Sequence, residues 1–300
     1  MKKIIIILSI FILLISFSTS EINAGELSLG IEKWSGHTTY KISGTTQNGD
    51  WKSILEFPLN TEFLKINYTD DIEVLAMLKS YTISYKRNIF KDSGTFKDSD
   101  WLYDINQKLI YAETKTRLTA DIFNFEVKGL TNQIVNRVNL SGLMGYKHQE
   151  FNFIAGDGWQ KSYLTDPPTT QEIDGDAIEY DITYMMPYMG LAVFNNHNKE
   201  INYIIKGSFI PRFWARDHDY HILRDKHAYT YVNGMGFNFS TYIQYKINND
   251  WDIKGEYEYL KASGKGSQRQ VFNDGTEYEN IAAEIYTLKH IVDFGFSYSF

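Results

Sequence analysis

Residues 288–300 at the end of the chain read LKHIVDFGFSYSF, and apolar and polar residues alternate along them almost without a break. Side chains in a strand switch faces at every residue, so this stretch has one apolar wall and one small or polar wall. The apolar wall consists of Val292, Phe294, Phe296, Tyr298 and Phe300. A strand of this kind that ends on an aromatic residue is typical of the closing strand of an outer-membrane β-barrel. A strand of a soluble β-sandwich can alternate in the same way.

Two earlier stretches repeat the pattern. In residues 251–259, Trp, Ile and Tyr alternate with Asp, Lys and Glu, and in residues 237–246, Phe, Ile and Tyr alternate with Asn, Ser, Gln and Lys. Four polar side chains on one wall of a strand need water or polar partners, because burying them without partners costs free energy. The lumen of a narrow barrel meets this need, and polar side chains such as Asn238, Gln244, Lys254 and Glu256 can fill it.

Clusters of Asn, Asp and Gly between the alternating runs indicate turns. They divide the chain into ten expected strands, near residues 27–43, 51–67, 72–87, 116–128, 135–155, 176–194, 201–216, 228–247, 251–261 and 288–300. Short turns at 68–71, 129–132, 195–198 and 248–250 alternate with longer connections at 44–50, 88–115, 156–175, 217–227 and 262–279. Short periplasmic turns and long outer loops are typical of an even-stranded barrel. The sequence therefore predicts one domain, an all-β, ten-stranded antiparallel transmembrane β-barrel with long extracellular loops.

The first residues indicate export. Met1-Lys2-Lys3 precede an apolar run from Ile4 to Phe17 and then small residues, which is typical of a secretory signal peptide. The apolar run is shorter than the ~20 residues that a membrane-spanning helix needs, which disfavours an uncleaved anchor. We expect a signal peptide over residues 1–24, with cleavage after Ser20 or Ala24, and the outer-membrane barrel over residues 25–300.

The composition limits the possible partners. The chain has 30 basic and 37 acidic residues, with a net charge of −7, which argues against nucleic acid as a partner. The negative charge is compatible with loops that attract cationic peptides. The chain has no cysteine, which excludes disulfides, thiolate metal sites and a lipidated cysteine.

Two of the long connections carry closely spaced titratable residues, Asp98 with Asp100 and Asp219 with His221. Residues two apart share a face of extended backbone, ~6.5–7 Å apart. Two neighbouring carboxylates raise one another's pKa, and a carboxylate beside a histidine orients the ring and stabilises its protonated form. If the two pairs face each other across the barrel mouth, a water between Asp98 and His221 can be activated for hydrolysis without a covalent intermediate.

Each motif has simpler interpretations when it is considered alone. An Asp-x-Asp or Asp-x-His segment in an acidic loop is often a solvated turn or a loose cation site with oxygen ligands. His218, His221 and His227 can also be interpreted as a transition-metal patch.

Several segments together resemble the omptin family, ten-stranded outer-membrane aspartyl-type endoproteases of Gram-negative bacteria. The resemblance covers nearly all of the mature chain at low identity. The matching segments are Ser28-Leu29-Gly30 with Ser35-Gly36, Asp98-Ser99-Asp100-Trp101, Leu143-Met144-Gly145-Tyr146, Met186-Pro187-Tyr188-Met189-Gly190-Leu191, Asp219-Tyr220-His221 and the terminal Phe300.

The resemblance implies a role for each acidic motif. His221 with Asp219 would activate water, Asp98 would hold that water from the opposite wall, and Asp100 would assist. Asp217 falls where the family has an acidic residue that receives a basic side chain next to the cut. The implied protein is a monomeric surface endopeptidase embedded in outer-membrane lipid. It would act on peptides or proteins without a metal or cofactor, although lipopolysaccharide is a candidate requirement.

The sequence also departs from the family pattern. Tyr40 lies near the position of a second acidic residue of the substrate pocket, and Glu113 to Thr116 stand where the family has a Ser and a His. Tyr146 is followed at alternate positions by His148 and Glu150, whereas the family's lipopolysaccharide site has an acidic and then a basic residue there. The alternatives to a protease are therefore a non-catalytic barrel of the same build, namely an adhesin, a lipid-anchored surface module or a small porin, and a secreted sandwich.

Overall fold

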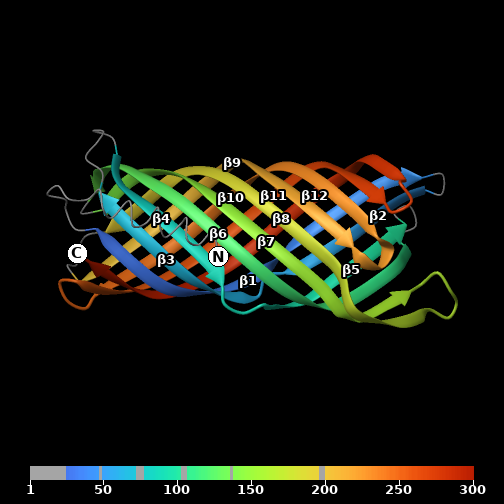
Figure 1. Cartoon of the computed structure of the whole chain (residues 1–300). Helices are drawn as coiled ribbons and strands as arrows, with labels where there is room; N and C mark the ends of the chain where they lie inside the picture. The colour runs from blue at the N-terminus through green and yellow to red at the C-terminus, as the bar shows by residue number, and fades with distance from the viewer. Residues whose placement is uncertain (1–24, 47–48, 72–77, 103–106, 136–137, 196–199) are drawn as a thin grey trace.

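The computed structural model describes residues 25–46, 49–71, 78–102, 107–135, 138–195 and 200–300, and the expected signal peptide lies outside these ranges. Twelve strand segments form one antiparallel sheet (Figure 1). The segments are β1 (Glu26–Thr46), β2 (Gly49–Pro58), β3 (Thr61–Asp71), β4 (Leu78–Asn88), β5 (Asp92–Leu102), β6 (Gln107–Val135), β7 (Val138–Ser162), β8 (Thr169–Asn195), β9 (Ile201–His221), β10 (Lys226–Lys246), β11 (Trp251–Phe272) and β12 (Glu277–Ser299). A short 3₁₀ turn, η1 (Ile222–Arg224), joins β9 to β10.

The sheet closes on itself as a ring of ten strands. Segments β2 and β3 both pair with β1, and β4 and β5 both pair with β6, so each of these two pairs is one barrel strand in two pieces. The last strand closes the ring on the first, in a register that runs from Glu26 opposite Ser299 to Ser43 opposite Ala282. The predicted ten-stranded antiparallel barrel is confirmed, and the soluble sandwich is excluded, because a closed ring has no second sheet to pack against.

The two interrupted strands break side by side, where the amide of Asn60 donates to the carbonyl of Ser93, and the β2–β3 break lies next to a glycine of β1. Gly36 has a φ of +146° and donates its amide to the Asn60 side chain, while its carbonyl accepts from Leu59, at the break between β2 and β3. A Cβ at Gly36 would lie 2.1 Å from the Leu288 carbonyl oxygen, so only glycine fits here.

The strands are longer than the sequence predicted, so both acidic motifs lie on strands and not in loops. The connections expected at 88–115 and 217–227 are largely β-structure, in β5 and β6 and in β9 and β10. The turn expected at 129–132 lies within β6. Clusters of charged and polar residues suggested loops in these places. The backbone ladder continues through them because polar side chains can face water on a strand that rises above the lipid.

The expected alternation of faces is confirmed. The apolar set of the closing strand faces outward, with exposures from 39% at Tyr298 to 57% at Phe294, whereas Ser297 faces the lumen and is buried. Many of the other exposed apolar side chains form a belt with this set around the half of the barrel nearer the C-terminus. They include Leu29, Ile31, Leu64, Phe125, Met144, Leu191, Ile205, Phe209, Phe237 and Phe239. This belt is the lipid-facing surface of the outer-membrane protein.

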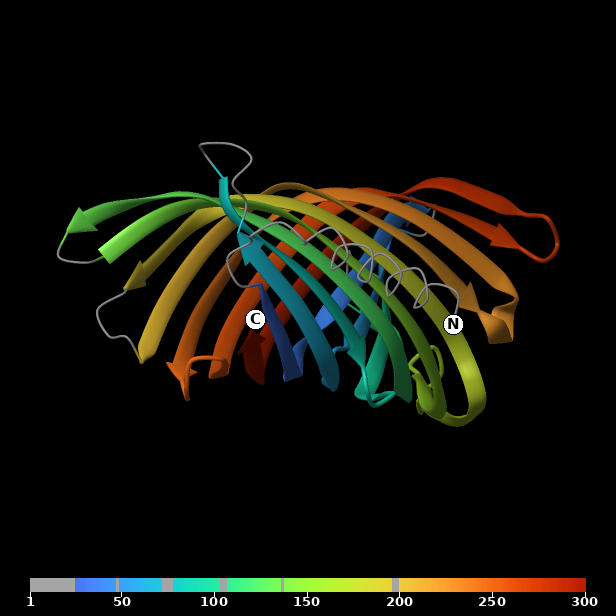
Figure 2. The same cartoon turned by 60° about the vertical axis from the view of Figure 1, so that its left-hand side comes forward.

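The opposite end of the barrel stands clear of this belt, and we call it the rim. Figures 1 and 2 show the β7–β8 and β11–β12 hairpins projecting at this end, away from the C-terminus. Strands of up to 29 residues, in β6, exceed the ~9–11 needed to cross lipid, as the sequence predicted. Among the described residues, no helix is long and apolar enough to span a membrane.

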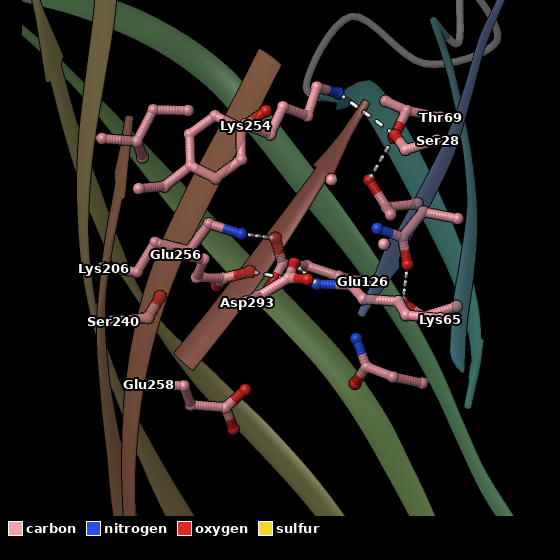
Figure 3. A pocket seen from close by; sticks show the side chains of 18 of the residues that line it. Ser28, Lys65, Thr69, Glu126, Lys206, Ser240, Lys254, Glu256, Glu258 and Asp293 are labelled. Atoms are coloured by element: carbon pink, nitrogen blue, oxygen red, sulfur yellow. Dashed lines mark hydrogen bonds and ion pairs between the residues drawn. The ribbon is translucent and has the colours of Figure 1, made fainter. Parts of the chain in front are cut away.

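Inside the membrane-spanning half, the lumen holds a layer of ion pairs around a cavity of about 220 Å³ (Figure 3). Lys65 pairs with Glu32, Glu256 and Asp293, at 3.1, 3.2 and 2.7 Å. Further pairs are Lys86 with Glu32, Lys206 with Glu126, Lys147 with Glu258 and Lys254 with Glu26. We call this set the lumen layer. It satisfies the polar wall that the sequence predicted.

Candidate functional site

The two acidic motifs lie on the lumen face of two strands at the rim. Asp98 and Asp100 belong to β5, and Asp219 and His221 belong to the last residues of β9. In the ring, β6, β7 and β8 separate β5 from β9, so the two motifs face each other across the lumen. The negative charge of Asp219 contributes to the raised pKa of Asp98, so the two carboxylates lie within electrostatic reach. The structure thus brings together the four residues that the sequence singled out.

Asp219 and His221 form a hydrogen-bonded pair, with Nε2 of His221 2.8 Å from Oδ2 of Asp219. Their side chains are 2% and 12% exposed. Alternation along β9 puts both on the same face, and Ala228 of β10 is the buried cross-strand neighbour of Asp219. A buried carboxylate in this position fixes the orientation of the ring. The other ring nitrogen, Nδ1, remains able to exchange a proton with a reactant.

Asp98 is placed between apolar neighbours. Its cross-strand partners are Leu55 of β2 and Ala112 of β6, which are both buried. Burial raises the pKa of Asp98 to about 7, with a further contribution from the Asp100 carboxylate, while the charges of Arg224 and Lys226 act in the opposite direction. Its Oδ1 atom accepts no hydrogen bond from a described residue. Near neutral pH this carboxyl can therefore hold or release a proton.

Asp217 lies two residues before Asp219 and faces the same lumen. The Tyr180 hydroxyl donates to its Oδ2 atom at 3.3 Å, and its Oδ1 atom accepts no hydrogen bond from a described residue. Burial raises the pKa of Asp217 to about 8, and the nearby Asp219 carboxylate adds to the shift. Among the described residues no lysine or arginine forms an ion pair with it. Such a buried carboxylate is suited to receive a cation brought by a ligand.

Tyr40 lies beside Asp217. Its hydroxyl is 2.7 Å from that of Thr230, the cross-strand partner of Asp217, and it also accepts from Gln268. Burial raises the pKa of Tyr40 well above its usual value, and the Asp217 charge adds to this effect. The pocket around Asp217 therefore has uncharged hydrogen-bonding groups on the side of β1.

Aromatic rings close the site from below. Tyr180 stacks on Phe57 with centroids 4.3 Å apart and planes at 10°, and Phe57 also contacts Phe96 and Phe153 at 4.7 and 4.9 Å. All four side chains are buried. They form an apolar floor beneath the titratable residues, which lowers the local dielectric and so raises the pKa of Asp98 and Asp217.

The three histidines of the possible metal patch do not share a face. His221 points into the lumen, whereas His218 and His227 lie on the outer face, where Nε2 of His218 is 3.0 Å from Nδ1 of His227. Tyr220 and Tyr229 stack on this histidine pair. Within the described ranges there is no group of three or more His, Cys, Asp or Glu side chains that could hold a metal ion.

The outer face of β7 does not fit a lipid phosphate in the way that the family pattern does. There His148 Nε2 is 3.1 Å from Glu150 Oε1, and its ring lies 6.5 Å from that of Tyr146. A carboxylate thus occupies the position where the resemblance implies a basic residue. Since like charges repel, Glu150 disfavours a phosphate at this point.

The sequence did not point to Tyr180, Arg224 or Lys226 as parts of the site. Tyr180 lies between Glu179 and Asp181, and Lys226 lies between Asp225 and His227, but neither belongs to a motif. Alternation offered one signal for Lys226, because it shares a face with Ala228 and Thr230. That signal has meaning only once the strand β10 is known to begin at Lys226.

Comparison with family models matches residues 61–300 to the omptin family. Among solved structures, the outer membrane protease OmpT from Escherichia coli superposes with a TM-score of 0.79 at 17% sequence identity, covering 94% of this chain and 99% of OmpT. The translocator domain of the autotransporter NalP from Neisseria meningitidis matches with a TM-score of 0.35 at 7% identity, covering 95% of this chain and 91% of that one. Comparison with curated proteins gave no significant match.

The likeness to OmpT extends over the whole barrel and agrees with the observed ring of strands and apolar belt. Because the family match covers most of the chain, the protein belongs to the omptin family of outer-membrane β-barrels.

Proposed function

We propose that the protein is an outer-membrane endopeptidase that hydrolyses peptide bonds at the rim with a water activated by Asp98 and His221. One observation carries the proposal: the Asp98 carboxyl lies within electrostatic reach of Asp219, the hydrogen-bond partner of His221. Direct attack by water requires acid–base groups that can hold the water and accept its proton. Asp98 and His221, which lie opposite each other above the apolar floor, are groups of this kind. OmpT, which shares the fold, is described as an outer membrane protease.

The chemistry follows from the side chains. Asp98, assisted by Asp100, holds the water, and His221 accepts its proton as the water oxygen bonds to the carbonyl carbon. Asp219 stabilises the imidazolium that forms. When the carbon–nitrogen bond breaks, the imidazolium returns the proton to the leaving amine. The products are an amine and a carboxylic acid, which then releases the second proton of the water to solvent, and no covalent enzyme intermediate is formed.

Asp217 gives the proposed enzyme a preference for a basic side chain next to the cut. A lysine or arginine of the substrate would pair with the Asp217 carboxylate, whose Oδ1 atom accepts no hydrogen bond from a described residue. Tyr40 and Gln268 add no second negative charge, so a pair of basic residues is less strongly favoured than in the family pattern. We expect a monomer that acts on peptides or proteins. Because Glu150 disfavours a phosphate, no step depends on lipopolysaccharide.

The test compares residues of the same type on the two faces of the wall. Asp98→Ala and His221→Ala remove lumen-facing groups, whereas Asp181→Ala and His218→Ala remove the same types from the outer face of β8 and β9. Cleavage of a peptide library is followed by mass spectrometry. We expect the lumen variants to lose roughly 10²–10⁴-fold in rate and the outer variants to match the parent. Equal cleavage by all five proteins would refute the assignment.

A further inference from the structure

The proposed reaction creates an electrostatic problem at the rim. Four carboxylates, Asp98, Asp100, Asp217 and Asp219, already surround the reaction site. Attack of water on a peptide carbonyl adds a further negative charge, on the former carbonyl oxygen. In a partly buried site above apolar rings, that charge is poorly screened, so a nearby positive group would lower the barrier substantially.

Lys226 is placed to supply that charge. It is the first residue of β10 and the cross-strand partner of His221, and it shares the lumen face with the buried Ala228 and Thr230. The Lys226 side chain is itself buried. Its ammonium interacts with Asp219, Asp98 and Asp100, so it lies among the groups that act on the water.

Lys226 also differs from the other buried lysines of the described chain. Lys65, Lys86, Lys147 and Lys254 are held in ion pairs of the lumen layer. Lys289 donates to Gln149 at 2.6 Å beneath the site. The Lys226 side chain has no hydrogen bond or ion pair with a described residue, so its charge is not committed to a structural partner. Arg224, the other cation near Asp98, is exposed on η1.

We propose that Lys226 is a further catalytic residue, whose ammonium stabilises the oxyanion formed when the activated water attacks the peptide carbonyl. This assignment rests on the proposed hydrolysis. The carbonyl π electrons move to oxygen as the water oxygen bonds to carbon, and Lys226 donates a hydrogen bond to that oxygen without transferring its proton. When the carbon–nitrogen bond breaks, the oxyanion electron pair re-forms the carbonyl bond, the bonding pair leaves with nitrogen, and His221 protonates that nitrogen. Burial lowers the pKa of Lys226, although the three carboxylates favour its charged form.

The experiment pairs two cations of the rim. Lys226→Met removes the buried charge beside His221, whereas Arg216→Met removes an exposed charge from the outer face of β9. At the pH of maximal activity, we expect Lys226→Met to lower kcat by roughly 10²–10³-fold with KM changed less than about threefold. Arg216→Met should keep kcat within about threefold. Lys226→Arg should recover part of the loss, which separates charge from folding.

A second measurement does not require turnover. A peptide phosphonate with lysine before the phosphorus carries a negative tetrahedral centre, and calorimetry gives its affinity for each variant. We expect Lys226→Met to weaken this binding by about the same factor as kcat. Equal binding by the parent and Lys226→Met would overturn the role of Lys226. A parent that binds the phosphonate but cleaves no peptide would overturn the proposed function instead.

Discussion

The barrel contains two clusters of charged side chains, which differ in how completely their charges are paired. In the lumen layer, every lysine named above has a carboxylate within 4 Å, and Lys65 alone contacts three. At the rim, Asp98 and Asp217 have raised pKa values and carboxylate oxygens without a described hydrogen-bond donor. Charges that satisfy each other stabilise a structure, whereas charges left partly unsatisfied can act on a ligand. The difference separates the half that crosses the membrane from the half that carries the proposed chemistry.

The largest expected effect concerns the rim, where Asp219 and His221 should work as one unit. Asp219→Asn and His221→Ala should each reduce kcat/KM by roughly 10²–10⁴-fold. The double variant should have the same kcat/KM as His221→Ala alone, because a carboxylate that acts only through the histidine has no effect once the histidine is removed. Peptide cleavage by the two single variants and the double variant measures this. Losses that multiply would show that the residues act independently.

The next effect concerns the lumen layer. Lys65→Met leaves Glu32, Glu256 and Asp293 without their shared cation, so the free energy of unfolding should fall by about 3–5 kcal/mol. Lys33→Met provides the control, because the Lys33–Glu62 pair is exposed and should contribute only about 0–1 kcal/mol. Urea unfolding followed by tryptophan fluorescence measures both. Equal stabilities of the Lys65→Met and Lys33→Met variants would show that the lumen layer stabilises the barrel no more than an exposed ion pair does.

A pH-dependent effect should distinguish Asp217 from an outer carboxylate. Its pKa is about 8 in the folded protein and 3.8 in the reference state, so between these values the folded state binds the extra proton. The free energy of unfolding contributed by this group therefore falls as pH rises from about 4 to about 8. Asp217→Asn should equal the parent in melting temperature at low pH and exceed it at pH 8. Asp181→Asn, on the outer face, should follow the parent, and parallel curves for all three proteins would contradict the raised pKa.

The smallest expected signal tests whether the lumen layer seals the barrel. In planar bilayers we expect no steady ion conductance from the parent protein, because ion pairs from several strands cross the lumen around Lys65 and Lys206 (Figure 3). Lys65→Met, if it inserts, should show more frequent openings. Steady conductance by the parent would favour the small-porin alternative and would mean that the lumen layer does not block ions.

Alternation by itself determined the class of this protein. The apolar and polar walls of residues 237–246, 251–259 and 288–300 fixed which side chains face lipid, and they predicted a polar lumen and ten strands. This inference works because lipid on one side and a lumen on the other impose a period of two on every strand. The spacing of the titratable residues and a family resemblance also identified candidate site residues from the sequence, namely Asp98, Asp100, Asp217, Asp219 and His221.

Only the tertiary structure decided where the strands end and which charges meet. Polar residues at 98–101 and 217–221 suggested loops, but they continue the barrel wall, because hydrogen bonds between neighbouring strands outweigh local turn preferences. The approach of Asp98 to Asp219 and the place of Lys226 beside His221 depend on ring closure and register. The raised pKa values depend on burial above Phe57 and Tyr180. The approach of Asp98 to Asp219 joins residues more than 100 positions apart, and no local pattern in a single sequence encodes it.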